Sequence, residues 1–151
     1  MANLLPIDFS QISTYITLAV ILILSVVLCM LAYRLMNVVP AKWLCDYDEE
    51  PDESLLGTRY IFKQSGIYTS ALFAIFNLGI FAFFGYSYYT IFFLLISITM
   101  LLIAMSDFKY TIIPDQFTIA LAVLCVALAI TDLFTQQIFI KEWWSIPLGA
   151  V

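Results

Sequence analysis

Long uncharged, apolar tracts alternate with short polar segments along this chain. The first tract runs from Phe9 to Tyr33 and is rich in Leu, Ile and Val. At about 1.5 Å per residue, it is long enough to cross a hydrocarbon core about 30 Å thick. Arg34 closes it, and its side chain can reach the headgroups. No basic residue precedes the tract, and no small-residue cleavage site follows it, so it does not resemble a secretory signal.

The second tract, residues 64–106, contains no charged residue and is long enough for two membrane spans. Its natural break is at 84–89, where Gly85 suits a turn and the tyrosines suit an interfacial aromatic belt. We therefore expect a helical hairpin, with helices near 65–84 and 88–107. The first of these helices carries small residues that would permit close helix packing, namely Gly66, Ser70, Ala71, Ala74 and Gly79.

A fourth helix is expected after Pro114, which interrupts any continuous helix. It should begin at Asp115 or Gln116 and end between Thr131 and Phe134, with Asp132 and residues 135–137 in an outer loop. Trp143 and Trp144 then suggest an interfacial anchor, and residues 145–151 begin another apolar stretch. The predicted fold class is an all-α, polytopic transmembrane helical bundle with about four spans and the start of another.

Composition supports a membrane protein, because 64% of residues are hydrophobic and the mean hydropathy is +1.02. The chain divides into a first helix (1–33), a polar loop (34–63) and a helical region (64–151). It has no His, which excludes imidazole chemistry within this chain. Cys29, Cys45 and Cys125 lack the spacing of a zinc site, so no metal is predicted. Six scattered basic residues argue against nucleic-acid binding.

The 34–63 loop contains most of the acidic residues and most of the basic residues of the chain. Its six acidic residues are Asp46, Asp48, Glu49, Glu50, Asp52 and Glu53. They form either a solvated charge run or a docking surface for a basic ligand. Four of the six basic residues, Arg34, Lys42, Arg59 and Lys63, also lie here. Because basic residues favour the cytoplasmic side, we expect this loop and Lys109 in the cytoplasm and the N-terminus outside.

The charged segment from Asp107 to Asp115 follows the second tract and holds two carboxylates, one Lys and one Pro. An ionisable group at the edge of a membrane core is costly to desolvate and often marks function. The alternative is that Asp107 only ends a helix at the water interface.

The stretch SDFKYTIIPDQFT resembles the signature of type IV prepilin peptidases, in which an Asp precedes a short turn, Ile-Pro-Asp or Leu-Pro-Asp, and a Thr that opens the next helix. Residues 30–40 (MLAYRLMNVVP) resemble the end of that family's first span, and Arg59-Tyr60 resembles the pair before its second. The resemblance touches about a third of the chain in the family's order. Gln64 stands where the family has an acidic residue.

The resemblance implies an integral membrane aspartic endopeptidase of the bacterial inner membrane. It would remove the basic leader peptides of prepilins or pseudopilins at the cytoplasmic face. Asp107 corresponds to one catalytic aspartate, and the acidic loop would dock the leader. Many family members also N-methylate the product with S-adenosylmethionine, and they often carry two pairs of loop cysteines, whereas this loop has only Cys45.

The second catalytic carboxylate is not evident in residues 1–151. Of two carboxylates that share a proton, one would take a proton from the attacking water and the other would donate a proton to the carbonyl oxygen. Asp115, after Pro114, is better placed to cap a helix and complement its dipole. We treat Asp115 and Lys109 as supporting candidates. In the family the other Asp lies in a later Gly-x-Gly-Asp motif, which these residues lack.

A rival interpretation is a non-catalytic, small polytopic membrane subunit or assembly factor, in which Asp107 and Asp115 only flank a turn. A transporter or channel is a third interpretation. The predicted spans hold no further charges, which argues against this third class.

Overall fold

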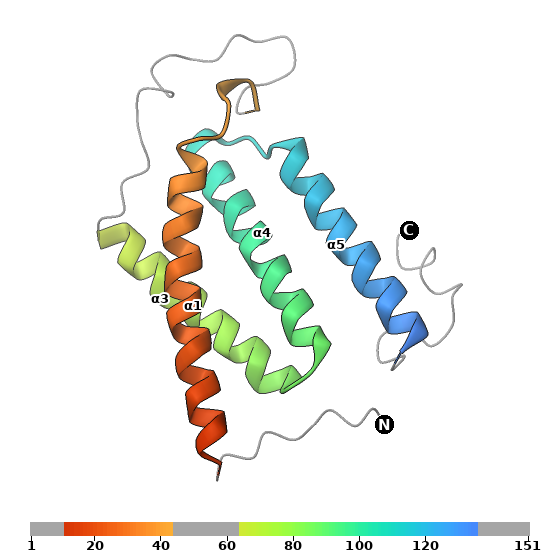
Figure 1. Ribbon diagram of the computed structural model, residues 1–151. Helices are drawn as coiled ribbons and strands as arrows, with labels where there is room; N and C mark the ends of the chain where they lie inside the picture. The colour runs from red at the N-terminus through yellow and green to blue at the C-terminus, as the bar shows by residue number, and fades with distance from the viewer. Residues whose placement is uncertain (1–10, 44–63, 136–151) are drawn as a thin grey trace.

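Four long helices make up the fold in Figure 1, a computed structural model that describes residues 11–43 and 64–135. They are α1 (Ile12–Met36), α3 (Gln64–Phe84), α4 (Tyr88–Tyr110) and α5 (Asp115–Phe134), and the short 3-10 helix η1 (Ala41–Trp43) follows α1. Every regular element within the described residues is helical. The predicted helix bounds are confirmed for α3 and α5, whereas α1 and α4 end later than expected.

Each long helix is long and apolar enough to cross a membrane. The outward side chains are largely apolar: Leu72 on α3 and Ile119 on α5 are 75% and 62% exposed. In a water-soluble protein such surfaces would be buried, but in a bilayer they face lipid tails. The protein is therefore a multi-pass membrane protein with an all-α transmembrane bundle.

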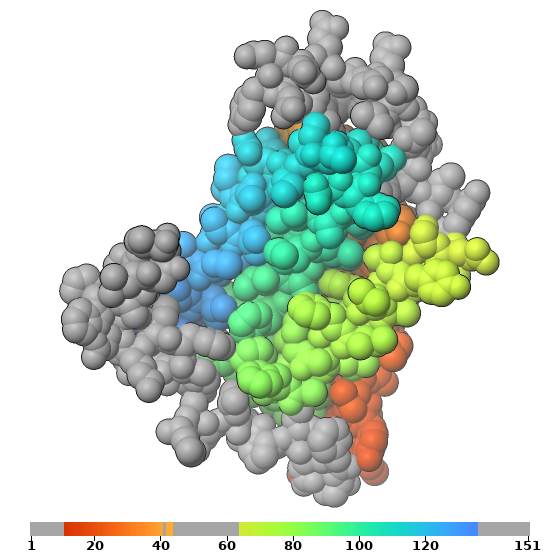
Figure 2. All heavy atoms as spheres, turned by 180° about the vertical axis from the view of Figure 1, so that it is seen from behind, coloured from red at the N-terminus to blue at the C-terminus, as the bar shows by residue number. Residues whose placement is uncertain are grey.

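The helices are arranged so that α1 packs mainly against α3, while α4 contacts α1, α3 and α5. Figure 2 shows the reverse face, where α3 lies obliquely across the molecule and α5 forms one edge. The ends of α1 and α4 and the start of α5 meet at one end of the bundle (Figure 1). We call this the Asp107 end, and we call the opposite end, where α3 turns into α4, the Gly85 end.

The small residues of α3 divide between two faces. Gly66, Ser70 and Ala74 are buried, as expected for close packing, and they lie on the face of the helix that also buries Phe73 and Asn77. The expectation was wrong for Ala71 and Gly79, which are exposed. Gly79 has no neighbouring atom within 4 Å of an added Cβ. Only the small residues in register with the buried stripe bring helices together.

The bundle has a polar interior layer that joins three helices. The Asn77 amide on α3 donates to Ser25 Oγ on α1 (2.9 Å), and Ser97 Oγ on α4 donates to Asn77 Oδ1 (2.8 Å). All three side chains are buried. Because lipid tails give helices no hydrophobic reason to associate, hydrogen bonds and tight packing have to hold them together.

The turn at the Gly85 end is built as the sequence predicted. Gly85 adopts φ 58°, a left-handed conformation that costs glycine little. Ser87 caps α4 by accepting from the Tyr89 amide (3.3 Å), and Thr90 Oγ1 donates to the Gly85 carbonyl (2.7 Å). The aromatic belt is only partly confirmed. Tyr86 is exposed, but Tyr89 is completely buried.

Candidate functional site at the Asp107 end

Asp107 lies on the last turn of α4, and its side chain is exposed. The helix was expected to end at this residue, yet it continues to Tyr110. The reason is local, since the Thr111 amide donates to the Asp107 carbonyl (2.8 Å) and closes one more turn. The neighbouring Phe108 is 95% exposed. Asp107 is therefore presented on a helix surface and is open to a further segment or a ligand.

The turn after α4 is tightly held. Thr111 ends the helix at φ 55°, the only positive φ among the described non-glycine residues. This conformation is rare for a β-branched residue and costs roughly 1–3 kcal/mol. Ser106 Oγ donates to the Ile112 carbonyl (2.8 Å), and Pro114 is fully buried. Packing and hydrogen bonds therefore hold a strained backbone beside Asp107.

Asp115 is the first residue of α5, and it is exposed. Pro114 precedes it in extended backbone conformation, and the Pro114 carbonyl accepts from the amides of Phe117 (3.0 Å) and Thr118 (3.4 Å). A negative charge at this position complements the positive end of the helix dipole. The predicted position of Asp115 at the helix start is confirmed, although Pro114, and not Asp115, occupies the N-cap position. Whether it also supports catalysis stays a prediction.

Lys109 is half-buried and lies near the ring of the buried Tyr110. Its Nζ is 5.0 Å from the ring centroid, a cation–π distance. This contact holds the ammonium group beside the last turn of α4. A supporting role for Lys109 toward a carboxylate stays a prediction.

An apolar cluster supports the Asp107 end from within. It includes Tyr33 and Met36 of α1, Met105 and Tyr110 of α4, and Phe117 of α5. These residues come from the last turns of α1 and α4 and the first turn of α5. They fix the relative positions of the two helices that carry Asp107 and Asp115.

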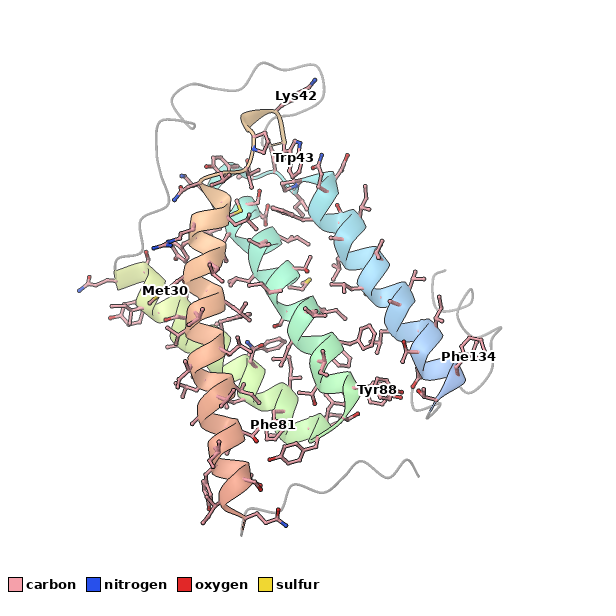
Figure 3. All side chains as sticks on the ribbon, viewed as in Figure 1. Met30, Lys42, Trp43, Phe81, Tyr88 and Phe134 are labelled. Atoms are coloured by element: carbon pink, nitrogen blue, oxygen red, sulfur yellow. The ribbon has the colours of Figure 1, made fainter. Side chains whose placement is uncertain are left out.

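The end of α1 differs from the prediction. Arg34 was expected to close the first helix, but α1 continues to Met36, so Arg34 lies in the last turn. A cation at this position complements the negative end of the helix dipole. The side chain is exposed, and Lys42 and Trp43 follow it at the same end of the bundle (Figure 3).

Several predicted features lie outside the described residues. These are the six acidic loop residues Asp46, Asp48, Glu49, Glu50, Asp52 and Glu53, together with Arg59-Tyr60, Cys45 and the Trp143-Trp144 anchor. Among the residues that are described, no group of three or more His, Cys, Asp or Glu could hold a metal ion.

A second polar cluster, at the Gly85 end, was missed by the sequence reasoning, and its Tyr89–Asp132 pair is buried. Asp132 was expected in an outer loop, but it lies in the last turn of α5 and is completely buried. It accepts a hydrogen bond from the Tyr89 hydroxyl on α4, and Tyr88 hydrogen-bonds to Thr135 beside it. Tyr88 and Phe134 lie at this end in Figure 3. In the sequence, the signal that could have indicated this contact was Asp132, a single acidic residue within the apolar tract of the fourth helix, together with the tyrosines near Gly85.

No protein-family model, curated protein or solved structure matches this chain.

Proposed function

We propose that the protein is a membrane-embedded aspartic endopeptidase that removes the leader peptide of type IV prepilin-like proteins. One observation carries the proposal. Asp107 and Asp115 are both exposed, on consecutive helices that a strained turn joins at one end of the bundle. Transmembrane helices end near water, where hydrolysis can occur, and ionisable residues there are often functional. The resemblance of residues 106–118 to the prepilin peptidase signature supports the same assignment.

Asp107 is the catalytic carboxylate in this proposal. In an aspartic dyad, one carboxylate takes a proton from water, which then attacks the peptide carbonyl, and the other donates a proton to the carbonyl oxygen. The partner carboxylate would come from a Gly-x-Gly-Asp motif beyond residues 1–151. The exposure of Asp107 leaves room for such a segment to pack beside it. Asp115 and Lys109 would position the turn.

The proposed substrates are prepilins or pseudopilins with short, basic leaders at the cytoplasmic face of a bacterial inner membrane. The six acidic residues of the 34–63 loop would attract such a leader by complementary charge. Methylation of the trimmed product with S-adenosylmethionine is a further activity that the family resemblance suggests. Proteolysis itself would need no cofactor.

The decisive experiment compares two substitutions in the complete enzyme. Asp107→Asn should abolish leader cleavage with expression unchanged, because an amide cannot share a proton with a partner carboxylate. Asp115→Asn, the matched control eight residues away, should retain substantial activity and act mainly through stability. Cleavage is read from the size shift of a prepilin substrate on a gel. Severe loss in Asp115→Asn with activity kept in Asp107→Asn would reverse the assigned roles.

The purified chain of residues 1–151 separates this proposal from its rival. It should be folded but unable to cleave a prepilin, because it supplies one catalytic carboxylate. Robust cleavage by residues 1–151 that is lost in Asp107→Asn would mean that the dyad is complete within these residues. If neither residues 1–151 nor any longer form of the protein cleaves a prepilin-like substrate, the non-catalytic subunit is the better interpretation.

A further inference from the structure

An apolar groove of about 380 Å³ lies between the end of α1 and the middle of α4. It is lined by Leu28, Leu31, Ala32 and Leu35 of α1, by Val38 just after α1, and by Ile98 and Leu102 of α4. We call it the α1–α4 groove. Leu31 and Leu35 of α1 are 51% and 48% exposed, and Val38 after the helix is 76% exposed, so this wall of the groove is open to the surroundings. Because both helices span the membrane, the groove opens toward lipid.

One charged side chain lines the groove among the described residues, and it belongs to Arg34. Arg34 is exposed and lies in the last turn of α1, two residues before the helix ends. At this depth the side chain can extend to the headgroup layer while its stem lies along the apolar wall. The groove therefore has apolar walls and a cation at the end that lies near the membrane surface.

We propose that the α1–α4 groove binds an anionic phospholipid, with an acyl chain along the apolar wall and the phosphate at Arg34. The guanidinium group matches a phosphate with two parallel hydrogen bonds. Basic pockets between transmembrane helices are a common form of headgroup site. The proposed lipid site lies at the Asp107 end, but its existence does not depend on the proposed peptidase activity.

A transmembrane helix of a protein partner is the competing occupant. Charge complementarity favours the lipid over any partner whose flanking segment is basic, because Arg34 would repel that segment. An anionic headgroup, in contrast, is attracted to the same position. The lining of the groove also suits a phospholipid, since its walls are apolar and only one end is charged.

Native mass spectrometry of the purified, delipidated protein in detergent tests the proposal. The probes are phosphatidylglycerol and phosphatidylcholine with identical acyl chains. The wild type should retain phosphatidylglycerol about fivefold better, the effect expected of one basic residue near an anionic lipid. Arg34→Gln should remove this preference. Lys42→Gln, which removes an exposed cation at the same end but outside the groove, should keep it.

Two further variants test the groove itself. Leu31→Trp should fill it and lower retention of both lipids. Arg34→Lys keeps the charge and should keep most of the headgroup preference, which provides a test if Arg34→Gln does not fold. Equal retention of the two lipids by the wild type would overturn the proposal. An equal loss in Arg34→Gln and Lys42→Gln would also overturn it, because the preference would then reflect general surface charge.

Discussion

Asn77 of α3 donates a hydrogen bond to Ser25 of α1 across the interior of the bundle, at 2.9 Å between Nδ2 and Oγ. Asn77 also accepts from Ser97 of α4, so one side chain connects three helices. Both serine hydroxyls lie within hydrogen-bond distance of carbonyls of their own helices, Ser25 of Ile21 (2.7 Å) and Ser97 of Leu94 (2.8 Å). Without Asn77, each serine hydroxyl therefore keeps a hydrogen-bond partner, which limits the loss of stability.

Replacing Asn77 should destabilise the bundle moderately. Interhelical hydrogen bonds in membranes contribute about 0.6 kcal/mol each and at most about 1.7. Asn77→Leu, which removes two of them, should lower the free energy of unfolding by about 1–2 kcal/mol. Steric-trap unfolding in bicelles measures this value.

A double-mutant cycle isolates the Asn77–Ser97 bond. Asn77→Ala and Ser97→Ala should show a coupling energy of about 0.6 kcal/mol. Ser65→Ala removes an exposed hydroxyl from the first turn of α3 and should change stability by less than about 0.5 kcal/mol. A coupling energy of zero would mean that the polar layer does not join α3 to α4.

The buried pair Tyr89 and Asp132 should behave non-additively. Tyr89→Phe and Asp132→Leu each remove one partner and leave the other buried, at a cost of about 1–3 kcal/mol. The double variant removes both polar groups, so its cost should be less than the sum. Thermal unfolding in detergent measures the three values. Tyr68→Phe, at an exposed tyrosine of α3, is the control, and strict additivity would contradict the prediction.

Thr111→Gly should stabilise the protein, because glycine adopts φ 55° without the Cβ clash. The relief of strain exceeds the added chain entropy, and the net gain should be about 0.5–1 kcal/mol. The matched control is Ile113→Gly in the same turn, where φ is negative and the substitution should destabilise. Both are read from thermal unfolding. A loss of stability in Thr111→Gly would show that its side chain matters more than its backbone strain.

Orientation can be tested at two exposed residues at opposite ends of the bundle. We expect the Asp107 end in the cytoplasm, because the basic residues gather there. With Cys29, Cys45 and Cys125 replaced by alanine, an impermeant thiol reagent added to intact cells should modify Tyr86→Cys but spare Lys42→Cys. Permeabilised cells should show both modified. The reverse pattern in intact cells would invert the topology.

Transmembrane helices were predictable from the sequence because burial in lipid needs only local information. A continuous apolar tract of sufficient length satisfies its own backbone hydrogen bonds as a helix, whatever it packs against. The break at Gly85 and the start of α5 at Asp115 follow from local backbone chemistry in the same way. The identification of Asp107 and Asp115 as candidate site residues likewise rested on the sequence alone.

Only the tertiary structure decided which side chains face each other. In a membrane helix the lipid-facing and protein-facing sides are both apolar, so the pattern of hydrophobic residues does not reveal the buried face. This is why Gly79 was wrongly expected at a helix interface, while the polar layer around Asn77 and the burial of Asp132 against Tyr89 were missed. These contacts join residues distant in sequence, and they depend on how the helices cross.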